Sequence, residues 1–311
     1  MQKQDSAAPA TPSAAGAFVA LRAWVVASRP HTLTIGINPV LVGCALAWRQ
    51  TGRIDVSVML MSMLGALLLQ TGTNLDNDVS DFERGTDRAG RLGLPRATAL
   101  GLLTPRQVRT ASRGCFALAT VIGVLLAWHG GWPIFVAGIA SAAAAMSYSG
   151  GPRPISYTPF GDLVVWLFFG LVAVTGTYYL QTFSLDRSVF IAAAMVGMPA
   201  AAVLVVNNYR DLEPDRAVGK RTLAVCLGRS FSRWEYSVLV LAPFGLLPLL
   251  ASQLRMGAAQ AIPLLALPIA IGQVRRFCRD TPGPAFNALL AETARLQVLF
   301  SILLGVALLF R

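Results

Sequence analysis

The segment Val189–Asp215 reads VFIAAAMVGMPAAAVLVVNNYRDLEPD, in which an uncharged apolar run of 18 residues is followed at once by amides and carboxylates. A run of that length without charge is long enough to cross the hydrocarbon core of a bilayer as a helix. A helix also satisfies its own backbone hydrogen bonds, as any chain in lipid must. The segment therefore predicts a transmembrane helix with a polar, acidic end.

Apolar runs of the same kind recur from Leu33 to the C-terminus. Charged residues are 13% of the 311 residues and hydrophobic residues 55%, whereas an ordinary soluble domain is about 25% charged. The runs predict an all-α integral membrane protein with about nine transmembrane helices in a single domain over residues 21–311. Their apolar cores are Leu33–Trp48, Val56–Gln70, Phe116–Trp128, Ile134–Met146, Leu163–Leu180, Val189–Val206, Val238–Leu250, Ile262–Ile271 and Leu296–Phe310.

The N-terminus differs in composition from the rest. Its first 15 residues are mainly Ala, Pro, Ser, Gln and Thr without an apolar run, so they have little surface to bury. We expect a disordered tail over residues 1–20 and no signal peptide, because no basic segment leads directly into an apolar stretch. The four cysteines are far apart and only two histidines occur, which argues against zinc and His-dependent catalytic sites.

The basic residues are distributed unevenly between the two sides of these spans. Of 26 Lys and Arg residues, 21 lie in the N-terminal segment and in the loops after spans two, four, six and eight, and 5 lie elsewhere. Cytoplasmic loops carry such an excess, so the N-terminus and the first set of loops are expected on the cytoplasmic face of the cell (inner) membrane. This orientation and anionic lipid explain the net charge of +11 without nucleic acid.

The carboxylates gather in two short windows on that same side. The chain has 15 Asp and Glu residues, and eight of them lie in TNLDNDVSDFERGTD (Thr73–Asp87) and VNNYRDLEPD (Val206–Asp215). Within the windows NDVSD (Asn77–Asp81) matches NNYRD (Asn207–Asp211), four spans apart. A repeat of this kind predicts two four-helix halves plus a ninth helix, with one acidic helix end from each half facing the other.

The spacing within each window indicates metal chemistry. Asn77 and Asp81 are four residues apart, as are Asn207, Asp211 and Asp215 in turn, so each set lies on one helix face if the helix continues. Pro214 is expected to end or bend the second helix. Clustered carboxylates need a neutralising cation, and Asp and Asn oxygens suit Mg²⁺, which usually shares its shell with substrate phosphates. Two such clusters across a cavity would suit a diphosphate.

Longer stretches around these windows resemble the UbiA superfamily of intramembrane prenyltransferases. NDVSDFERGTDRAGRLGLPRATALGLLT (Asn77–Thr104) is similar to the pattern NDxxDxxxGxDxxxRxGPxR of its 1,4-dihydroxy-2-naphthoate polyprenyltransferases, except that Leu94 precedes Pro95. NNYRDLEPDRAVGKRTLAVCLG (Asn207–Gly228), GGPRPISYTPFGD (Gly150–Asp162) and SRPHTL (Ser28–Leu33) resemble further segments of that family. The resemblance covers nearly the whole chain after about residue 20.

The resemblance implies roles for individual residues. Catalysis would centre on Asp81 and Asp211. The Mg²⁺ ligands would be Asn77, Asp78, Asp81, Asn207, Asp211 and Asp215.

Basic and aromatic side chains complete the implied site. Arg153, Lys220 and Arg91 would bind the diphosphate. Tyr148 and Tyr157 flank Arg153 and are candidates for contact with the acceptor, although an aromatic belt at the membrane interface would explain them equally well.

The implied reaction is Mg²⁺-dependent transfer of a polyprenyl group from polyprenyl diphosphate to 1,4-dihydroxy-2-naphthoate, with decarboxylation, giving a demethylmenaquinone. One alternative within the superfamily is another acceptor: 4-hydroxybenzoate, homogentisate or a tetrapyrrole. A second alternative is a cation-coupled transporter, but transporter sites usually lie near the bilayer midplane, whereas these acids lie at helix ends.

Overall fold

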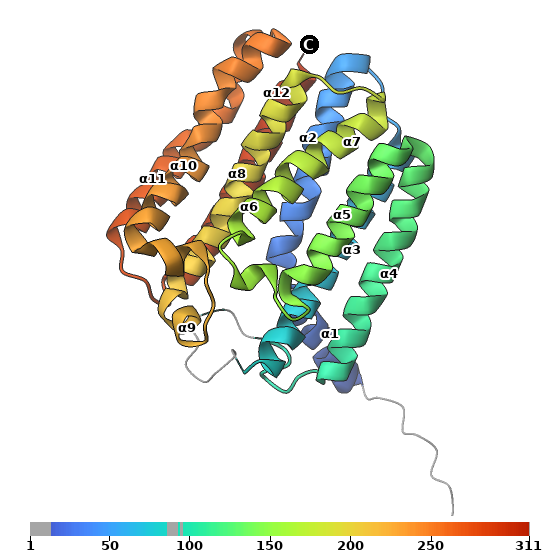
Figure 1. Ribbon diagram of the computed structural model, residues 1–311. Coiled ribbons are helices and arrows are strands. Elements are labelled where there is room, and N and C mark those ends of the chain that lie inside the picture. The colour runs from blue at the N-terminus through green and yellow to red at the C-terminus, as the bar shows by residue number, and fades with distance from the viewer. Residues whose placement is uncertain (1–13, 86–92, 94–95, 311) are drawn as a thin grey trace, which may run out of the picture.

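The computed structural model describes residues 14–85, 93 and 96–310, and within them the chain is helical (Figure 1). Twelve α-helices are joined by two 3₁₀ segments and one π-helical segment in the described residues. Their bounds are α1 Ala14–Ser28, α2 Pro30–Thr51, α3 Val56–Glu83, α4 Pro105–Gly130, α5 Trp132–Ser149, η1 Ile155–Tyr157, α6 Gly161–Trp166, η2 Leu167–Val172, α7 Ala173–Thr182, α8 Arg187–Arg210, α9 Leu212–Ala217, α10 Leu223–Leu254, η3 Gly257–Ala266, α11 Leu267–Arg279 and α12 Phe286–Leu309.

The prediction of an all-α membrane protein with nine spans is confirmed. Among the described residues, nine helical segments are long and apolar enough to cross a membrane. Most are longer than their apolar cores, because the helices continue into polar sequence at their ends. Helix α3, for example, begins at the cap Asp55, whose carboxylate accepts from Ser57 N (2.9 Å) and Val58 N (3.1 Å), and runs on past Gln70 to Glu83.

One boundary and the type of one helix differ from the sequence-based expectation. The predicted tail over residues 1–20 is too long, because α1 begins at Ala14; residues 1–13 lie outside the described part. Ala23 and Ala27 of α1 are buried in one apolar cluster with Leu75 and Val79 of α3, and this packing favours a helix. The eighth span is 3₁₀ over η3, which contains Pro263, before it becomes α-helical in α11.

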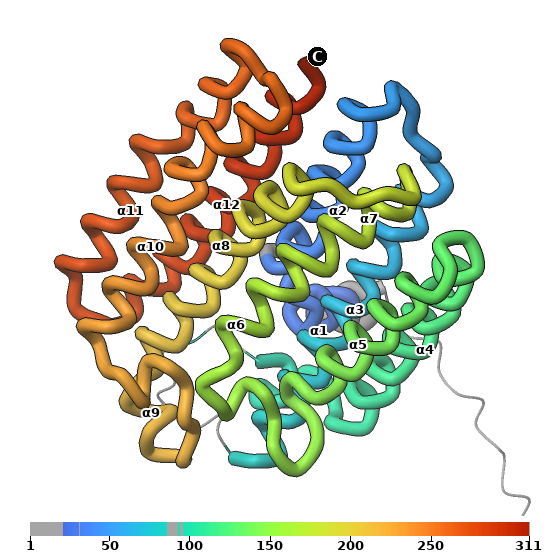
Figure 2. The backbone as a smooth tube through the Cα atoms, turned by 45° about the horizontal axis from the view of Figure 1, so that its top comes forward, coloured from blue at the N-terminus to red at the C-terminus, as the bar shows by residue number. Residues whose placement is uncertain are grey.

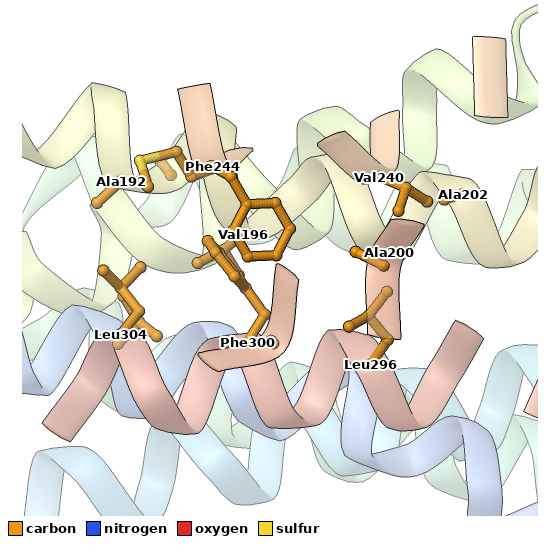
Figure 3. Close-up of a cluster of buried hydrophobic side chains, with 14 of the residues drawn as sticks. Ala192, Val196, Ala200, Ala202, Val240, Phe244, Leu296, Phe300 and Leu304 are labelled. Atoms are coloured by element: carbon orange, nitrogen blue, oxygen red, sulfur yellow. The ribbon is translucent and has the colours of Figure 1, made fainter. Parts of the chain in front are cut away.

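Helix α8 forms the centre of the bundle. Within its membrane window 72% of the residues are buried, compared with 11% in α3. Figures 1 and 2 show α2, α8 and α12 between α10 and α11 on one side and α3, α4 and α5 on the other. In the core shown in Figure 3, Val196 of α8 lies beside Phe244 and Phe300, whose rings meet edge to face at 5.2 Å. This packing fixes the position of the polar end of α8.

One close approach of two elements in this core depends on glycine. A Cβ atom on Gly197 of α8 would lie 2.6 Å from the carbonyl oxygen of Trp166 and 2.8 Å from the Cα of Gly170, in η2. No side chain fits at such distances, so the pair lets η2 pack directly on α8. Small residues at helix contacts are the usual means of close packing in membranes.

The outer surface of the bundle is apolar. Leu118, Val121 and Leu125 of α4 are each more than half exposed, and so is Ile139 of α5. Such a surface would be unfavourable in water but suits lipid. α9 and the turn after α3 lie at one end of the bundle, and the C-terminus lies at the opposite end (Figure 1).

Candidate active site

The first acidic window forms the last turns of α3. Asn74, Asp78 and Asp81 are buried there, and Asn77 lies between them at the wall of two cavities. Arg84 caps this end: its guanidinium donates to Ser149 O (2.6 Å), at the end of α5, and to Gly151 O (2.8 Å) just beyond it. The polar end of α3 is therefore tied to its neighbour.

The second window lies at the end of α8. The helix stops at Arg210, and α9 starts at Leu212 with Pro214 inside it. The four-residue spacing nevertheless persists, because Asp211 N donates to Asn207 O (3.0 Å) and Asp215 N donates to Asp211 O (2.8 Å). The expected interruption at Pro214 thus falls earlier, at Asp211, and leaves the three polar residues on successive turns.

The two windows meet at one small polar cavity of about 50 Å³. Carboxylates from both windows line it, which places the first and second halves of the chain around one space. The charged and amide residues of its wall are Asn77, Asp81, Arg96, Asn207, Asn208, Asp211, Asp215 and Lys220.

Each carboxylate of this cavity is paired with a cation. Asp81 pairs with Arg96, which is 5% exposed. Asp211 pairs with Arg210, whose Nε and Nη2 donate to the two carboxylate oxygens at 2.8 and 2.6 Å. Removing one partner of such a buried pair leaves an uncompensated charge, so the acids and bases of this site depend on one another.

The third carboxylate is held less tightly. Asp215 Oδ1 lies 3.3 Å from Lys220 Nζ. Burial raises the pKa of Asp215 above its ordinary value; Lys220 opposes this rise and Asp211 adds to it. A cation beside Asp215 would favour its ionised form.

Asp78 has other partners. Its two oxygens accept from Ala97 N (3.0 Å) and Thr98 N (3.1 Å), and Asp78 is not among the residues that line either cavity. The structure thus gives no support to the expectation that Asp78 faces a metal alongside the other predicted ligands.

The predicted diphosphate-binding residues are only partly brought together. Lys220 lines the polar cavity. Arg153 does not: its side chain is exposed on the connection from α5 to η1, and a phosphate contact at this position stays a prediction. Arg91 lies outside the described residues.

The two tyrosines are placed differently from each other. Tyr148 of α5 lines both cavities. Tyr157 lines neither; Arg84 lies 5.2 Å and Lys220 4.9 Å from the centroid of its ring. The two cation–π contacts explain how Tyr157 helps to hold Lys220, and its contact with the acceptor stays a prediction.

Two arginines of the site were missed by sequence reasoning. Arg96 is the last residue of the Asn77–Arg96 match to NDxxDxxxGxDxxxRxGPxR, so the pattern did contain a signal for it. Arg210 lies inside the second window, between Asn207 and Asp211. Its guanidinium also donates to Asn207 Oδ1 and to Asn287 Oδ1, both at 2.7 Å.

A second, mainly apolar cavity of about 510 Å³ lies in the membrane-spanning part of the bundle. Its wall extends along α3 from Asn77 to Ser62 and includes Phe168, Phe169 and Leu126. Both cavities share Asn77, Arg96, Tyr148, Leu204 and Asn207 as lining residues. A polar space for an anionic group thus adjoins a long apolar space.

The donor set of the polar cavity suits Mg²⁺. Among the described residues no three His, Cys, Asp or Glu side chains are grouped closely enough to hold an ion alone. Mg²⁺, however, is usually bound through one or two carboxylates together with substrate phosphates and water. Asp81 and Asp211 with the amide oxygens of Asn77 and Asn207 match that requirement once a diphosphate is present.

These features define a class of protein: an integral membrane enzyme that handles the anionic head of a substrate in a polar cavity and its apolar tail within the bundle. The chain matches the UbiA prenyltransferase family over residues 37–309 and belongs to that family. It is a multi-pass membrane prenyltransferase, and the alternative of a cation-coupled transporter is set aside.

Individual relatives agree with this assignment. The chain is 32% identical over 298 residues to the 1,4-dihydroxy-2-naphthoate octaprenyltransferase of Escherichia coli (strain K12), covering 91% of this chain and 93% of that protein. It is 29% identical over 284 residues to UbiA prenyltransferase domain-containing protein 1 of Homo sapiens, covering 90% and 81%. The solved structure of a UbiA homolog from Archaeoglobus fulgidus, bound to GPP and Mg²⁺, shares the fold with a TM-score of 0.64 at 14% identity, over 92% of this chain and 99% of that one.

Proposed function

We propose that this protein transfers a polyprenyl group from polyprenyl diphosphate to 1,4-dihydroxy-2-naphthoate. The proposal rests on one observation: the polar and the apolar cavity meet at Asn77, Arg96 and Asn207. A prenyl diphosphate has the same division into a small, highly charged head and a long apolar chain. The junction is where its first prenyl carbon would lie.

The head of the donor would occupy the polar cavity. Asp81, Asp211 and Asp215 with Asn77 and Asn207 would hold Mg²⁺ against the diphosphate, and the bound ion would supply charge stabilisation for the leaving group. Arg96 and Lys220, which also line this cavity, would bind diphosphate oxygens directly. These roles agree with the GPP and Mg²⁺ bound in the Archaeoglobus fulgidus homolog.

The ion pairs have a consequence for binding. Because Asp81 and Asp211 are already paired with Arg96 and Arg210, the site is close to neutral before the substrate arrives. An incoming diphosphate and its cation would exchange partners with these pairs, so no isolated charge need be buried at any stage.

The acceptor would meet the donor at the junction. There the bond between the first prenyl carbon and its oxygen breaks, and diphosphate leaves with the electron pair. The electron-rich naphthoate ring attacks that carbon, and the ring loses its carboxyl group as CO₂, so the products are the quinol form of a demethylmenaquinone, CO₂ and diphosphate. Tyr148 lines the junction and would contact the reacting groups.

The choice of naphthoate is supported by the E. coli relative at 32% identity and by the pattern in Asn77–Arg96. The second candidate is a UbiA-family reaction with another aromatic acceptor, since UbiA prenyltransferase domain-containing protein 1 of Homo sapiens is nearly as similar. The choice between these acceptors therefore needs a direct test.

The test is turnover by the purified protein with Mg²⁺ and a polyprenyl diphosphate. Parallel reactions contain 1,4-dihydroxy-2-naphthoate or 4-hydroxybenzoate, and diphosphate release and the prenylated product are both measured. We expect turnover of the naphthoate. Turnover of 4-hydroxybenzoate alone would exclude the naphthoate assignment while keeping the family.

A further inference from the structure

Asp78 is buried on α3, with 1% of its surface exposed, but does not line the polar cavity. Its Oδ2 accepts from Ala97 N at 3.0 Å, and its Oδ1 accepts from Thr98 N at 3.1 Å. The Thr98 hydroxyl donates to the same Oδ1. Both carboxylate oxygens are therefore taken up by donors from one segment of chain.

That segment is a short turn that starts at Arg96. Leu100 N donates to Arg96 O at 3.0 Å, and Gly101 N donates to Thr98 O at 3.0 Å. The first N–H groups of a helical turn have no partner within it. Asp78 supplies their acceptors, as an N-cap side chain does, but from another helix. Bonds to an ionised carboxylate are the stronger kind, so α3 fixes the backbone of this turn.

The residue that the turn brings to the site is Arg96. Its guanidinium lines both cavities and pairs with Asp81 of α3. Asp78 and Asp81 are three residues apart and so lie on neighbouring positions of one helix face. One turn of α3 therefore holds both the backbone next to Arg96 and the side chain of Arg96 itself.

We propose that Asp78 is a positioning residue and not a metal ligand. It holds the Arg96–Thr98 turn so that the guanidinium of Arg96 meets the diphosphate at the junction of the two cavities. The inference rests on the proposed function and deepens it. It removes the Asp78 carboxylate from the set of metal ligands and gives it the role of accepting hydrogen bonds from backbone N–H groups.

The second window has an amide where the first has the carboxylate of Asp78, and the partners of the two side chains explain this difference. Asn208, the counterpart of Asp78, has its Nδ2 3.3 Å from Oδ1 of the buried Asp162. An amide can donate to a carboxylate, whereas a second carboxylate would repel it. Where the partners are N–H donors the chain has Asp, and where the partner is a carboxylate it has Asn.

The test compares four variants of the full-length protein: Asp78→Asn, Arg96→Gln, the double variant of these two, and Asp81→Asn. Binding of geranylgeranyl thiolodiphosphate, which does not react, is measured by calorimetry at saturating Mg²⁺, and Mg²⁺ is then titrated at saturating analogue. The binding measurement needs no acceptor, so it tests the role of Asp78 independently of the naphthoate reaction. If the proposed reaction is wrong, the wild-type protein will show no turnover of the naphthoate.

We expect Asp78→Asn to weaken analogue binding by about tenfold or more, to a similar extent as Arg96→Gln. The double variant should bind no more weakly than Arg96→Gln, because the two changes act through one contact. The Mg²⁺ concentration for half-saturation should stay within about twofold of wild type in Asp78→Asn, a change of the size seen for substitutions away from a site, and should rise clearly in Asp81→Asn.

The proposal would be overturned if Asp78→Asn raised the half-saturating Mg²⁺ concentration as much as Asp81→Asn does. It would also be overturned if the losses of analogue binding were additive in the Asp78→Asn/Arg96→Gln double variant. If Asp78→Asn does not fold, Thr98→Val decides, since it removes one donor and keeps the Asp78 charge. Thr98→Val should bind the analogue more weakly at unchanged Mg²⁺ dependence; binding equal to wild type would contradict the proposed role.

Discussion

Replacing Arg96 by Gln removes a cation that lines both cavities and lies against Asp81. Two effects follow from its position. The variant loses a charge-assisted contact to diphosphate. It also breaks the ion pair with Asp81, which is buried, since the side chains of Arg96 and Asp81 are only 5% and 6% exposed. The first effect acts on catalysis and the second on stability, so the two can be measured separately.

The expected magnitudes come from these contacts. Hydrogen bonds to charged groups contribute about 1.5–3 kcal/mol, which corresponds to a decrease of about 10- to 150-fold in kcat/KM for the prenyl diphosphate. Breaking a buried ion pair by removing one partner costs up to about 3–5 kcal/mol of stability. Arg96→Lys should fall between wild type and Arg96→Gln, since Lys keeps the charge and loses the planar fork of donors.

The assay is steady-state turnover with the acceptor saturating and the prenyl diphosphate varied, together with the melting temperature in detergent. Arg153→Gln is the matched control: it removes the same group from an exposed side chain and should stay within about twofold of wild type. Equal kinetics for the two variants, or a greater loss in Arg153→Gln, would refute the placement of the diphosphate beside Arg96.

Three further predictions concern packing, metal and orientation. Gly197→Ala places a methyl group 2.6 Å from a backbone oxygen and should destabilise the protein by about 1–3 kcal/mol, measured as a lower melting temperature. Gly114→Ala has open space around the added methyl group and should not lower it. Equal melting temperatures of the two variants would count against this packing. EDTA should abolish turnover and added Mg²⁺ should restore it; turnover that survives EDTA would argue against the metal. In a cysteine-free background, an impermeant thiol reagent on intact cells should label Ser184→Cys and spare Arg106→Cys and Ala217→Cys, and the reverse pattern would invert the proposed orientation.

Hydropathy alone predicted the membrane fold, because nine uncharged runs leave few other ways to satisfy a backbone in lipid. It underestimated the lengths of the helices, since it marks where the apolar sequence ends and not where the helix does. Helix α3 continues through Asn74 and Asp78 to Glu83 because these polar side chains find partners among neighbouring elements. The start of α1 at Ala14 was missed for a related reason: its contact with α3 is tertiary.

The acidic part of the site followed from spacing, because helix periodicity converts sequence distance into a shared face. Its basic part depended on long-range pairing. Arg96 lies in the turn that Asp78 holds and pairs with Asp81 from there, and Tyr157 of η1 contacts Lys220 in the loop between α9 and α10. No periodicity encodes such contacts, so exposed Arg153 and buried Arg96 could not be distinguished by composition.

Both halves of the chain build one proposed diphosphate site, and the double variant Asp81→Asn/Asp211→Asn is its sharpest test. The two residues line the same cavity from α3 and from the end of α8. Residues that act as a unit are strongly non-additive. We expect kcat/KM to be nearly abolished in each single variant and the double variant to be little worse than either. Modest, additive losses would contradict it.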